Sequence, residues 1–275
     1  MAEGIDFERQ IAQDKAIKNN MDRIGKKILI MSGKGGVGKT TVTINLANAL
    51  VDSGRTVGIL DTDLHGPNVA KMLGCEGGTL VSNDEGKTFE PVEVRKGLKV
   101  MSLAFATEKD QPIVWRGPMK MSAIRQFLEQ ANWGTLDYLL IDSPPGTGDE
   151  QLTVCQSIRS MTGSIIVTTP QDVAILDARR SVNFSKQLNL SVLGIIENMS
   201  GLVCPHCGAE IDLFGRGGGR KLAEETGVPF LGEIPIELPV REDEDQGRSV
   251  LKDKPESAST KAFLAIAGMI DGTNT

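Results

Sequence analysis

Aromatic residues are scarce in this 275-residue chain, at 4% of the sequence, with one tyrosine and two tryptophans. A packed core must therefore consist mainly of aliphatic side chains, which the 40% hydrophobic content allows. Basic residues are also in deficit, since 30 Lys and Arg face 36 Asp and Glu, for a net charge of −6. This acidic balance argues against a nucleic-acid surface as the main function of the chain.

Long apolar runs are missing, and none approaches the ~18 residues of a membrane span. The first six residues have neither an apolar signal core nor an Arg-rich presequence. The sequence thus predicts a cytoplasmic protein without a membrane partner. Only four cysteines are present, and in a reducing compartment a close pair of them indicates metal or redox chemistry rather than a structural disulfide.

A glycine-rich stretch lies between an apolar run at 28–31 and a segment at 42–50 with helical apolar spacing. Strand, glycine-rich turn and helix form the context of a phosphate-binding P-loop. The backbone N–H groups cradle phosphate oxygens, and the helix N-terminus adds partial positive charge. Lys39 is expected to reach the β- and γ-phosphates and Thr40 to ligate Mg²⁺. The predicted nucleotide-binding loop comprises Gly33, Lys34, Gly35, Gly36, Val37, Gly38, Lys39, Thr40 and Thr41.

Three aspartates follow predicted strands at the edge where open α/β sheets bind ligands. Asp61 and Asp63 come after the apolar run 57–60, and Asp142 ends the run that begins at 136. Asp142 occupies the Walker B position, where a carboxylate holds Mg²⁺ through water or the P-loop threonine. The sequence favours separate tasks for Asp61 and Asp63 beside a triphosphate. The alternative is that both are ordinary carboxylates that cap a following helix.

The remaining pattern alternates strands and helices, with strands at 98–103, 165–169 and 192–196 and helices at 119–131 and 172–188. Such alternation predicts right-handed crossovers and one parallel sheet. The expected fold is α/β, a single-domain P-loop NTPase with a mostly parallel central sheet flanked by helices on both faces. We expect a polar arm or helix at 1–25, the ATPase domain at 26–270 and a tail at 271–275. The stretch 74–96 is predicted to be a hairpin or surface excursion, and the acidic run 241–245 a solvated helix face or loop.

Cys204 and Cys207 form a Cys-x-x-Cys pair followed by a glycine. One such pair supplies two ligands, whereas a tetrahedral zinc or a 4Fe–4S cluster takes four thiolates. Cys75 and Cys155 are isolated in the sequence, so a twofold dimer would have to supply the second pair by symmetry. The alternatives are an intersubunit zinc knuckle and a thioredoxin-like redox pair.

Several motifs resemble one branch of a known superfamily. Lys34 after the first glycine resembles the deviant Walker A of the MinD, ParA, nitrogenase iron protein, ArsA and Mrp/ApbC proteins. The stretches Trp115-Arg116-Gly117-Pro118 and Asp142-Ser143-Pro144-Pro145-Gly146-Thr147-Gly148-Asp149 are similar to the Mrp/ApbC branch. The cysteine pair after Glu197-Asn198-Met199-Ser200 is also where that branch has it. The resemblance covers roughly 26–270.

The resemblance implies an ATP-sandwich homodimer in which Lys34 crosses to the partner's nucleotide. It further implies that Asp61 lies in the outer shell of Mg²⁺, and that Asp63 orients or deprotonates the attacking water. Asn198 would read the adenine edge together with backbone around Pro235 and Glu237. Cys204 and Cys207 would bridge a labile 4Fe–4S cluster between subunits.

The function so implied is an ATP-binding, slowly hydrolysing iron–sulfur cluster carrier that uses ATP, Mg²⁺ and a 4Fe–4S cluster. Its partners would be a second copy, apo iron–sulfur proteins as recipients and a cluster-assembly scaffold as donor, with no nucleic acid and no membrane. One alternative is a MinD/ParA-like positioning switch with an intersubunit zinc clasp. Another is an electron-transfer reductase like the nitrogenase iron protein, whose cluster cysteines come from two separated segments.

Overall fold

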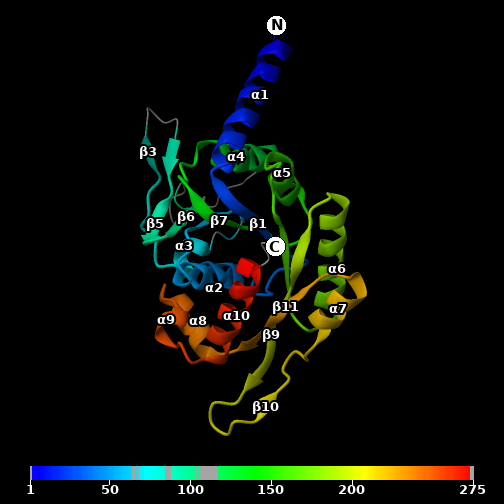
Figure 1. Ribbon diagram of the computed structural model, residues 1–275. Helices are drawn as coiled ribbons and strands as arrows, with labels where there is room; N and C mark the ends of the chain where they lie inside the picture. The colour runs from blue at the N-terminus through cyan, green and yellow to red at the C-terminus, as the bar shows by residue number, and fades with distance from the viewer. Residues whose placement is uncertain are drawn as a thin grey trace.

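A mostly parallel sheet forms the centre of the molecule (Figure 1). The structure, a computed structural model, describes residues 2–63, 66, 68–83, 88–102, 105 and 117–272. Within this part the central sheet runs β10-β9-β8-β1-β7-β2-β6-β5, with β11 also paired to β9. Only the β5–β6 and β9–β10 pairs of this sheet are antiparallel there. The strands are β1 Ile24–Ser32, β2 Val57–Asp61, β5 Val92–Arg95, β6 Leu98–Ser102, β7 Leu136–Asp142, β8 Gly163–Thr168, β9 Val192–Val203, β10 Glu210–Ile211 and β11 Phe230–Ile236.

Helices cover both faces of the sheet, which confirms the predicted α/β architecture. Side chains of β1 alternate between two apolar clusters: Ile28 and Ile30 face one, and Leu29 and Met31 face the other. Burial on both faces explains why the central strands are continuous apolar runs. The first face is covered by α2 Lys39–Asp52, α3 Val69–Met72, α8 Leu238–Asp245, α9 Val250–Asp253 and α10 Ala258–Gly272. The second is covered by α1 Ala2–Met21, α4 Gly117–Gln130, α5 Asp149–Ser157, α6 Asp172–Gln187 and α7 Gly218–Thr226.

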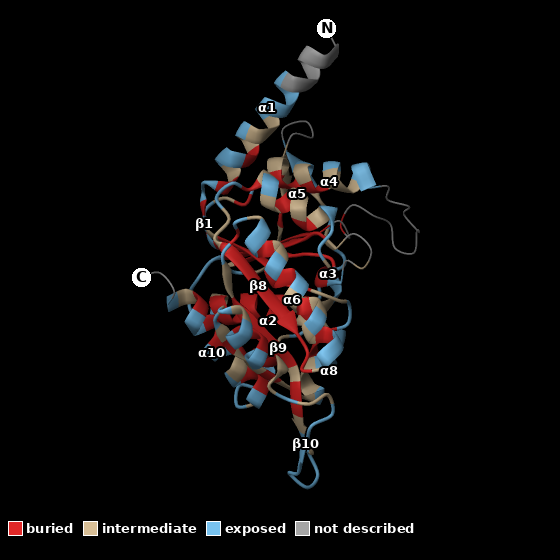
Figure 2. Ribbon diagram, turned by 90° about the vertical axis from the view of Figure 1, so that its right-hand side faces the viewer, coloured by how far each residue is buried: buried red, intermediate tan, exposed pale blue. Residues whose placement is uncertain are grey.

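The N-terminal segment is helical, and its end packs on the body of the protein. Ile17 and Met21 of α1 are buried, whereas the helix further toward the N-terminus projects from the body (Figures 1 and 2). The Asn20 amide donates hydrogen bonds to the carbonyl oxygens of Leu128 (3.0 Å) and Ala131 (2.6 Å), beside α4. The strand that follows, β1, begins at Ile24.

The predicted excursion at 74–96 contains β3 Val81–Asn83 and β4 Thr88–Glu90, which pair antiparallel, and the edge strand β5 of the central sheet. Trp115 and Arg116 lie outside the described residues, as do Leu64, His65 and Pro67 after the predicted Asp61–Asp63 site. No helix among the described residues combines the length and apolar content needed to cross a bilayer.

Candidate functional site

The glycine-rich loop joins β1 to α2, as the sequence predicts. Gly36 and Gly38 have φ values of +79° and +77°, a region that favours glycine. A Cβ on Gly33 would lie 2.1 Å from the backbone carbon of Asp177 on α6, and one on Gly38 would lie 2.3 Å from the Asn198 amide nitrogen. Close approach of neighbouring elements thus requires glycine at positions 33 and 38, and backbone conformation requires it at positions 36 and 38.

Asp142, at the end of β7, is the centre of a buried polar network behind the loop. The Lys39 Nζ forms an ion pair with Asp142 Oδ1 at 2.8 Å. The Thr40 hydroxyl donates to Oδ2 at 2.8 Å, and the Thr43 hydroxyl to Oδ1 at 2.8 Å. The structure therefore brings the predicted Walker B carboxylate to the predicted phosphate-binding lysine and magnesium-binding threonine. A carboxylate and a hydroxyl oxygen side by side are the kind of ligand that Mg²⁺ binds, directly or through water.

Asp61 lies beside Asp142, because the two residues are partners in the β2–β7 register. Its Oδ2 accepts a hydrogen bond from the Ser102 hydroxyl (3.0 Å), and its Oδ1 accepts one from the Asp63 backbone N–H (3.0 Å). Burial, and then the negative charge of Asp142, raise the pKa of Asp61 well above its usual range. Asp63 lines the cavity in front of this network, whereas Asp61 is buried and does not line that cavity.

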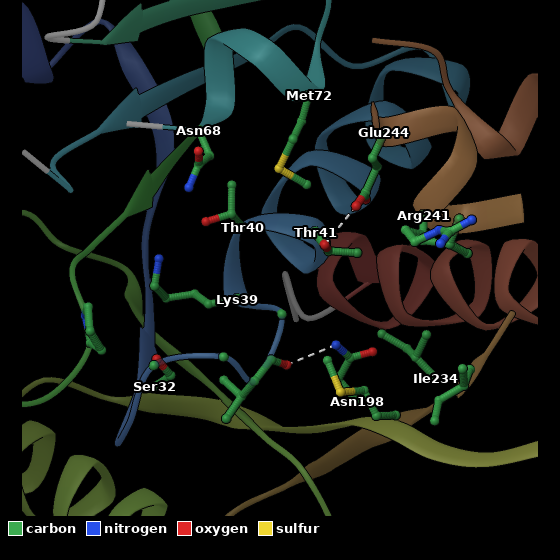
Figure 3. A pocket seen from close by; sticks show the side chains of 18 of the residues that line it. Ser32, Lys39, Thr40, Thr41, Asn68, Met72, Asn198, Ile234, Arg241 and Glu244 are labelled. Carbon is green, nitrogen blue, oxygen red and sulfur yellow. Dashed lines mark hydrogen bonds between the residues drawn. The ribbon is translucent and has the colours of Figure 1, made fainter. Parts of the chain in front are cut away.

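A cavity of about 720 Å³ opens in front of the loop (Figure 3). Every predicted nucleotide contact from Lys34 to Thr41 lines it, as do Asn198, Pro235 and Glu237. Gly33 is not among the lining residues. The Asn198 amide donates to the Val37 carbonyl oxygen at 2.9 Å, so β9 is bonded to the loop. The Glu237 carboxylate instead accepts the backbone N–H groups of Ala258 (3.1 Å) and Ser259 (2.9 Å) at the start of α10.

The acidic run 241–245 lies on α8 and is exposed at three of its five positions, but the prediction of a solvated face is wrong for Asp243 and Glu244. Asp243 is 3% exposed and Glu244 is 8% exposed. Asp243 pairs with Arg248 at 2.7 Å, and Glu244 lines the cavity. Asp243 and Glu244 lie three and four positions after Val240, on the same side of the helix as this apolar residue. That spacing was the one signal in the sequence that the two side chains are buried.

The cysteine pair occupies the tip of a hairpin between β9 and β10, at the lower end of Figure 1. The Cys204 N–H bonds the Ala209 carbonyl oxygen (2.9 Å), and the Gly208 N–H bonds the Cys204 carbonyl oxygen (2.9 Å). Backbone N–H groups of Cys207 and His206 point at the Cys204 sulfur and lower its pKa. Such a turn favours a thiolate and is suited to binding a metal. Among the described residues no cluster of three or more His, Cys, Asp or Glu exists that could complete a metal site.

Glu197 ties the base of this hairpin together, a role that the sequence did not reveal. Its buried carboxylate accepts hydrogen bonds from the Ser200 hydroxyl (2.6 Å) and from the backbone N–H groups of Gly217 (2.8 Å) and Gly219. Gly217 and Gly219 lie at the start of α7, where free N–H groups favour a negative charge. The chain entering the hairpin is thereby bonded to the chain leaving it.

Comparison with known proteins decides the family. The family model of the NUBPL iron-transfer P-loop NTPases matches residues 23–271. The chain belongs to this family. A curated iron–sulfur cluster carrier protein of Methanocaldococcus jannaschii is 54% identical over 86% of this chain and 81% of its own length. The carrier protein of Saccharolobus solfataricus is 47% identical over 94% of this chain and 87% of its own length.

Solved structures agree with the family and the fold. A nucleotide-binding protein from Archaeoglobus fulgidus in complex with ADP is 40% identical, with a TM-score of 0.77, over 91% of this chain and 96% of that protein. The MinD protein of Pyrococcus horikoshii, complexed with Mg-ADP, is 26% identical, with a TM-score of 0.67, over 90% and 96%. The predicted membership of an iron–sulfur carrier branch of the MinD/ParA-like P-loop ATPases is therefore confirmed.

Proposed function

We propose that this NUBPL-family NTPase binds ATP with Mg²⁺, hydrolyses it slowly and carries a 4Fe–4S cluster between the Cys204 and Cys207 thiolates of two copies. The cysteine hairpin supports this proposal most directly. Its tip holds two thiols per chain, and the Cys204 sulfur faces two backbone N–H donors. Two such hairpins supply the four thiolates that a cluster takes. Cys75 and Cys155 pack against the two apolar clusters instead, and burial raises the pKa of each to about 11.

In this proposal the nucleotide occupies the cavity with its phosphates on the glycine-rich loop. Lys39 binds the β- and γ-phosphates, while Thr40 and Asp142 hold Mg²⁺ directly or through water, with Asp61 behind them. Asp63 orients the attacking water, and Lys34 reaches the partner's nucleotide. Asn198 and the backbone of Pro235 and Glu237 contact the adenine. Supporting this arrangement, all but Asp61 and Asp142 line the one cavity, and Asp142 is bonded to two of its lining residues.

Strand β9 supports a coupling between nucleotide and cluster. It carries Asn198 in the cavity and ends one residue before Cys204. The strand leaving the hairpin is followed by Leu213 and Phe214, which also line the cavity. A change in the bound nucleotide can therefore reach the thiols through a few residues of β9 and of the chain after β10. We propose that one nucleotide state loosens the dimer, so that the cluster is released to apo iron–sulfur proteins, and that the other closes the dimer after a cluster-assembly scaffold has loaded it. The reduced thiols that this requires fit a cytoplasmic location.

Iron, acid-labile sulfide and zinc content after anaerobic reconstitution test the proposal. The expected result is about four irons and four sulfides per dimer, abolished in the Cys204→Ala/Cys207→Ala variant. Cys75→Ser/Cys155→Ser is the matched control and should retain the cluster. Stoichiometric zinc without sulfide would contradict cluster carriage and favour the alternative, a MinD/ParA-like switch with an intersubunit zinc clasp.

A further inference from the structure

Glu244 is a nearly buried carboxylate in the wall of the cavity, and no role in the proposed chemistry uses it. Its Oε2 accepts a hydrogen bond from the Thr41 hydroxyl at 2.8 Å, and its Oε1 accepts one from the Asn45 amide at 2.8 Å (Figure 3 shows the first). Thr41 and Asn45 are one helical turn apart on α2. The carboxylate is thus held in place by two donors from the helix that follows the glycine-rich loop.

All hydrogen-bond donors to Glu244 in the described part of the chain are neutral. No Lys or Arg of that part forms an ion pair with it, whereas Asp142 has Lys39 and Asp243 has Arg248. Glu197, a buried carboxylate with a structural role, also has only neutral donors in that part, but it accepts three hydrogen bonds where Glu244 accepts two. Each carboxylate oxygen accepts about two hydrogen bonds. With one donor on each, Glu244 retains acceptor capacity toward the cavity that it lines.

The position of Glu244 in the cavity determines which part of a bound nucleotide its carboxylate contacts. Lys39 and Thr40 face Asp142, at the phosphate end, whereas the next residue, Thr41, is rotated by about 100° on the helix and faces Glu244. Figure 3 shows Lys39 on one side of the cavity and Arg241 and Ile234 on the other, with Thr41 between them. Glu244 therefore lies beside the middle of the cavity, beyond the phosphate-binding residues.

The chemistry of a nucleotide offers one partner for a carboxylate at this place. Phosphate oxygens repel it, so they belong at the Lys39 end. The ribose hydroxyls are neutral donors, and a carboxylate that accepts from ribose hydroxyls is a recurrent device for binding nucleotides. We propose that Glu244 accepts a hydrogen bond from the ribose hydroxyls and makes this NTPase select ribonucleotides over 2′-deoxyribonucleotides.

The inference rests on the proposed ATP site, and equilibrium dissociation constants for ATP, 2′-deoxy-ATP and 3′-deoxy-ATP at pH 8 test it. The wild-type protein should bind at least one deoxynucleotide roughly ten- to hundredfold more weakly than ATP, the range expected for a hydrogen bond to a charged group. Glu244→Gln should bind ATP more weakly and reduce that ratio by about threefold or more, because a neutral amide oxygen is a weaker acceptor than a carboxylate. Glu242→Gln, an exposed change on the same helix, should leave the ratio unchanged.

Three outcomes would overturn the inference. Equal wild-type affinity for ATP and both deoxynucleotides excludes ribose selection. An equal loss for all three nucleotides in a folded Glu244→Gln protein means that the residue only positions Thr41. Failure of the wild-type protein to bind any of them would remove the proposed ATP site and this inference together, so the two failures are distinguishable. Thermal unfolding of each variant checks that it is folded.

Discussion

At the scale of single residues, the buried carboxylates near the glycine-rich loop differ in how their charge is compensated. Asp142 is ion-paired with Lys39, and removing one member of such a buried pair costs about 3–5 kcal/mol of unfolding free energy. Glu244 has hydrogen bonds but no ion pair in the described part of the chain. Burial raises its pKa to about 7, although the bonds from Thr41 and Asn45 act in the opposite direction.

This pKa gives Glu244 a defined pH signature. The unfolded glutamate loses its proton near its ordinary pKa of 4.5, while the folded one keeps it to about 7. The folded state binds more protons between these values, so the contribution of Glu244 to the free energy of unfolding falls as pH rises from 4.5 to 7. The fall amounts to roughly 3 kcal/mol at most.

Chemical denaturation at several pH values between 4.5 and 7.5 measures this contribution as a difference between variants. We expect Glu244→Gln to be less pH-dependent than the wild type over that interval. Glu242→Gln, whose side chain is exposed, should follow the wild-type curve. Parallel curves for wild type and Glu244→Gln would show that the carboxylate titrates normally.

At the scale of elements, β9 links the two sites. This 12-residue strand carries Asn198 beside the loop and runs on toward Cys204. The chain leaves ordinary strand geometry at Met199 and Gly201, whose φ values are +58° and +78°. Because left-handed backbone is unfavourable for methionine, Met199 needs support from its surroundings. Glu197 supplies that support by bonding Ser200, Gly217 and Gly219.

A Glu197→Gln substitution tests this role. It replaces one acceptor oxygen by an N–H₂ group, which faces backbone N–H donors and cannot bond them. We expect a folded protein that binds ATP normally but loses reconstituted iron to a chelator about tenfold faster, equivalent to about 1.4 kcal/mol.

The matched control for that variant is Glu210→Gln, in the same hairpin, which removes only an exposed ion pair with Arg216. Its rate of iron loss should equal the wild-type rate. An unchanged rate in Glu197→Gln would show that the base of the hairpin does not set how firmly the cluster is held.

At the scale of the whole molecule, the carboxyl ends of the parallel strands concentrate the polar groups at one edge of the sheet, as expected for this class of fold. Lys34 lines the cavity there, and its side chain makes no ion pair or hydrogen bond among the described residues. Because its ammonium group has no such partner there, Lys34 can bind an anionic group of another molecule. This agrees with the proposed contact to the partner's nucleotide.

Lys34→Ala should therefore lower ATP hydrolysis by about 10³-fold or more, in the range of an arginine finger supplied in trans. ATP affinity of the monomer should change little, and the ATP-dependent dimer should weaken. Single-turnover hydrolysis and light scattering with and without ATP measure these effects. Lys252→Ala, an exposed change on α9, is the control. Unimpaired hydrolysis by Lys34→Ala would exclude a catalytic role for that lysine.

The sequence by itself determined the parts of this protein whose chemistry lies in contiguous residues. The glycine-rich loop, the aspartates at strand ends and the Cys-x-x-Cys turn were predicted because each is specified by neighbours along the chain. The parallel sheet was predicted because buried strands are apolar runs separated by amphipathic helices. The roles assigned to these residues in binding and hydrolysis remain predictions.

Only the tertiary structure decided which distant segments meet. Thr41 and Glu244 are 203 positions apart, and the spacing of Glu244 from Val240 does not say which helix the glutamate contacts. Glu197 likewise meets Gly217 and Gly219 because β9, the hairpin and α7 pack together, not because of their spacing. Local motifs follow from backbone geometry and residue type, whereas partners such as these depend on the packing of the entire sheet and its helices.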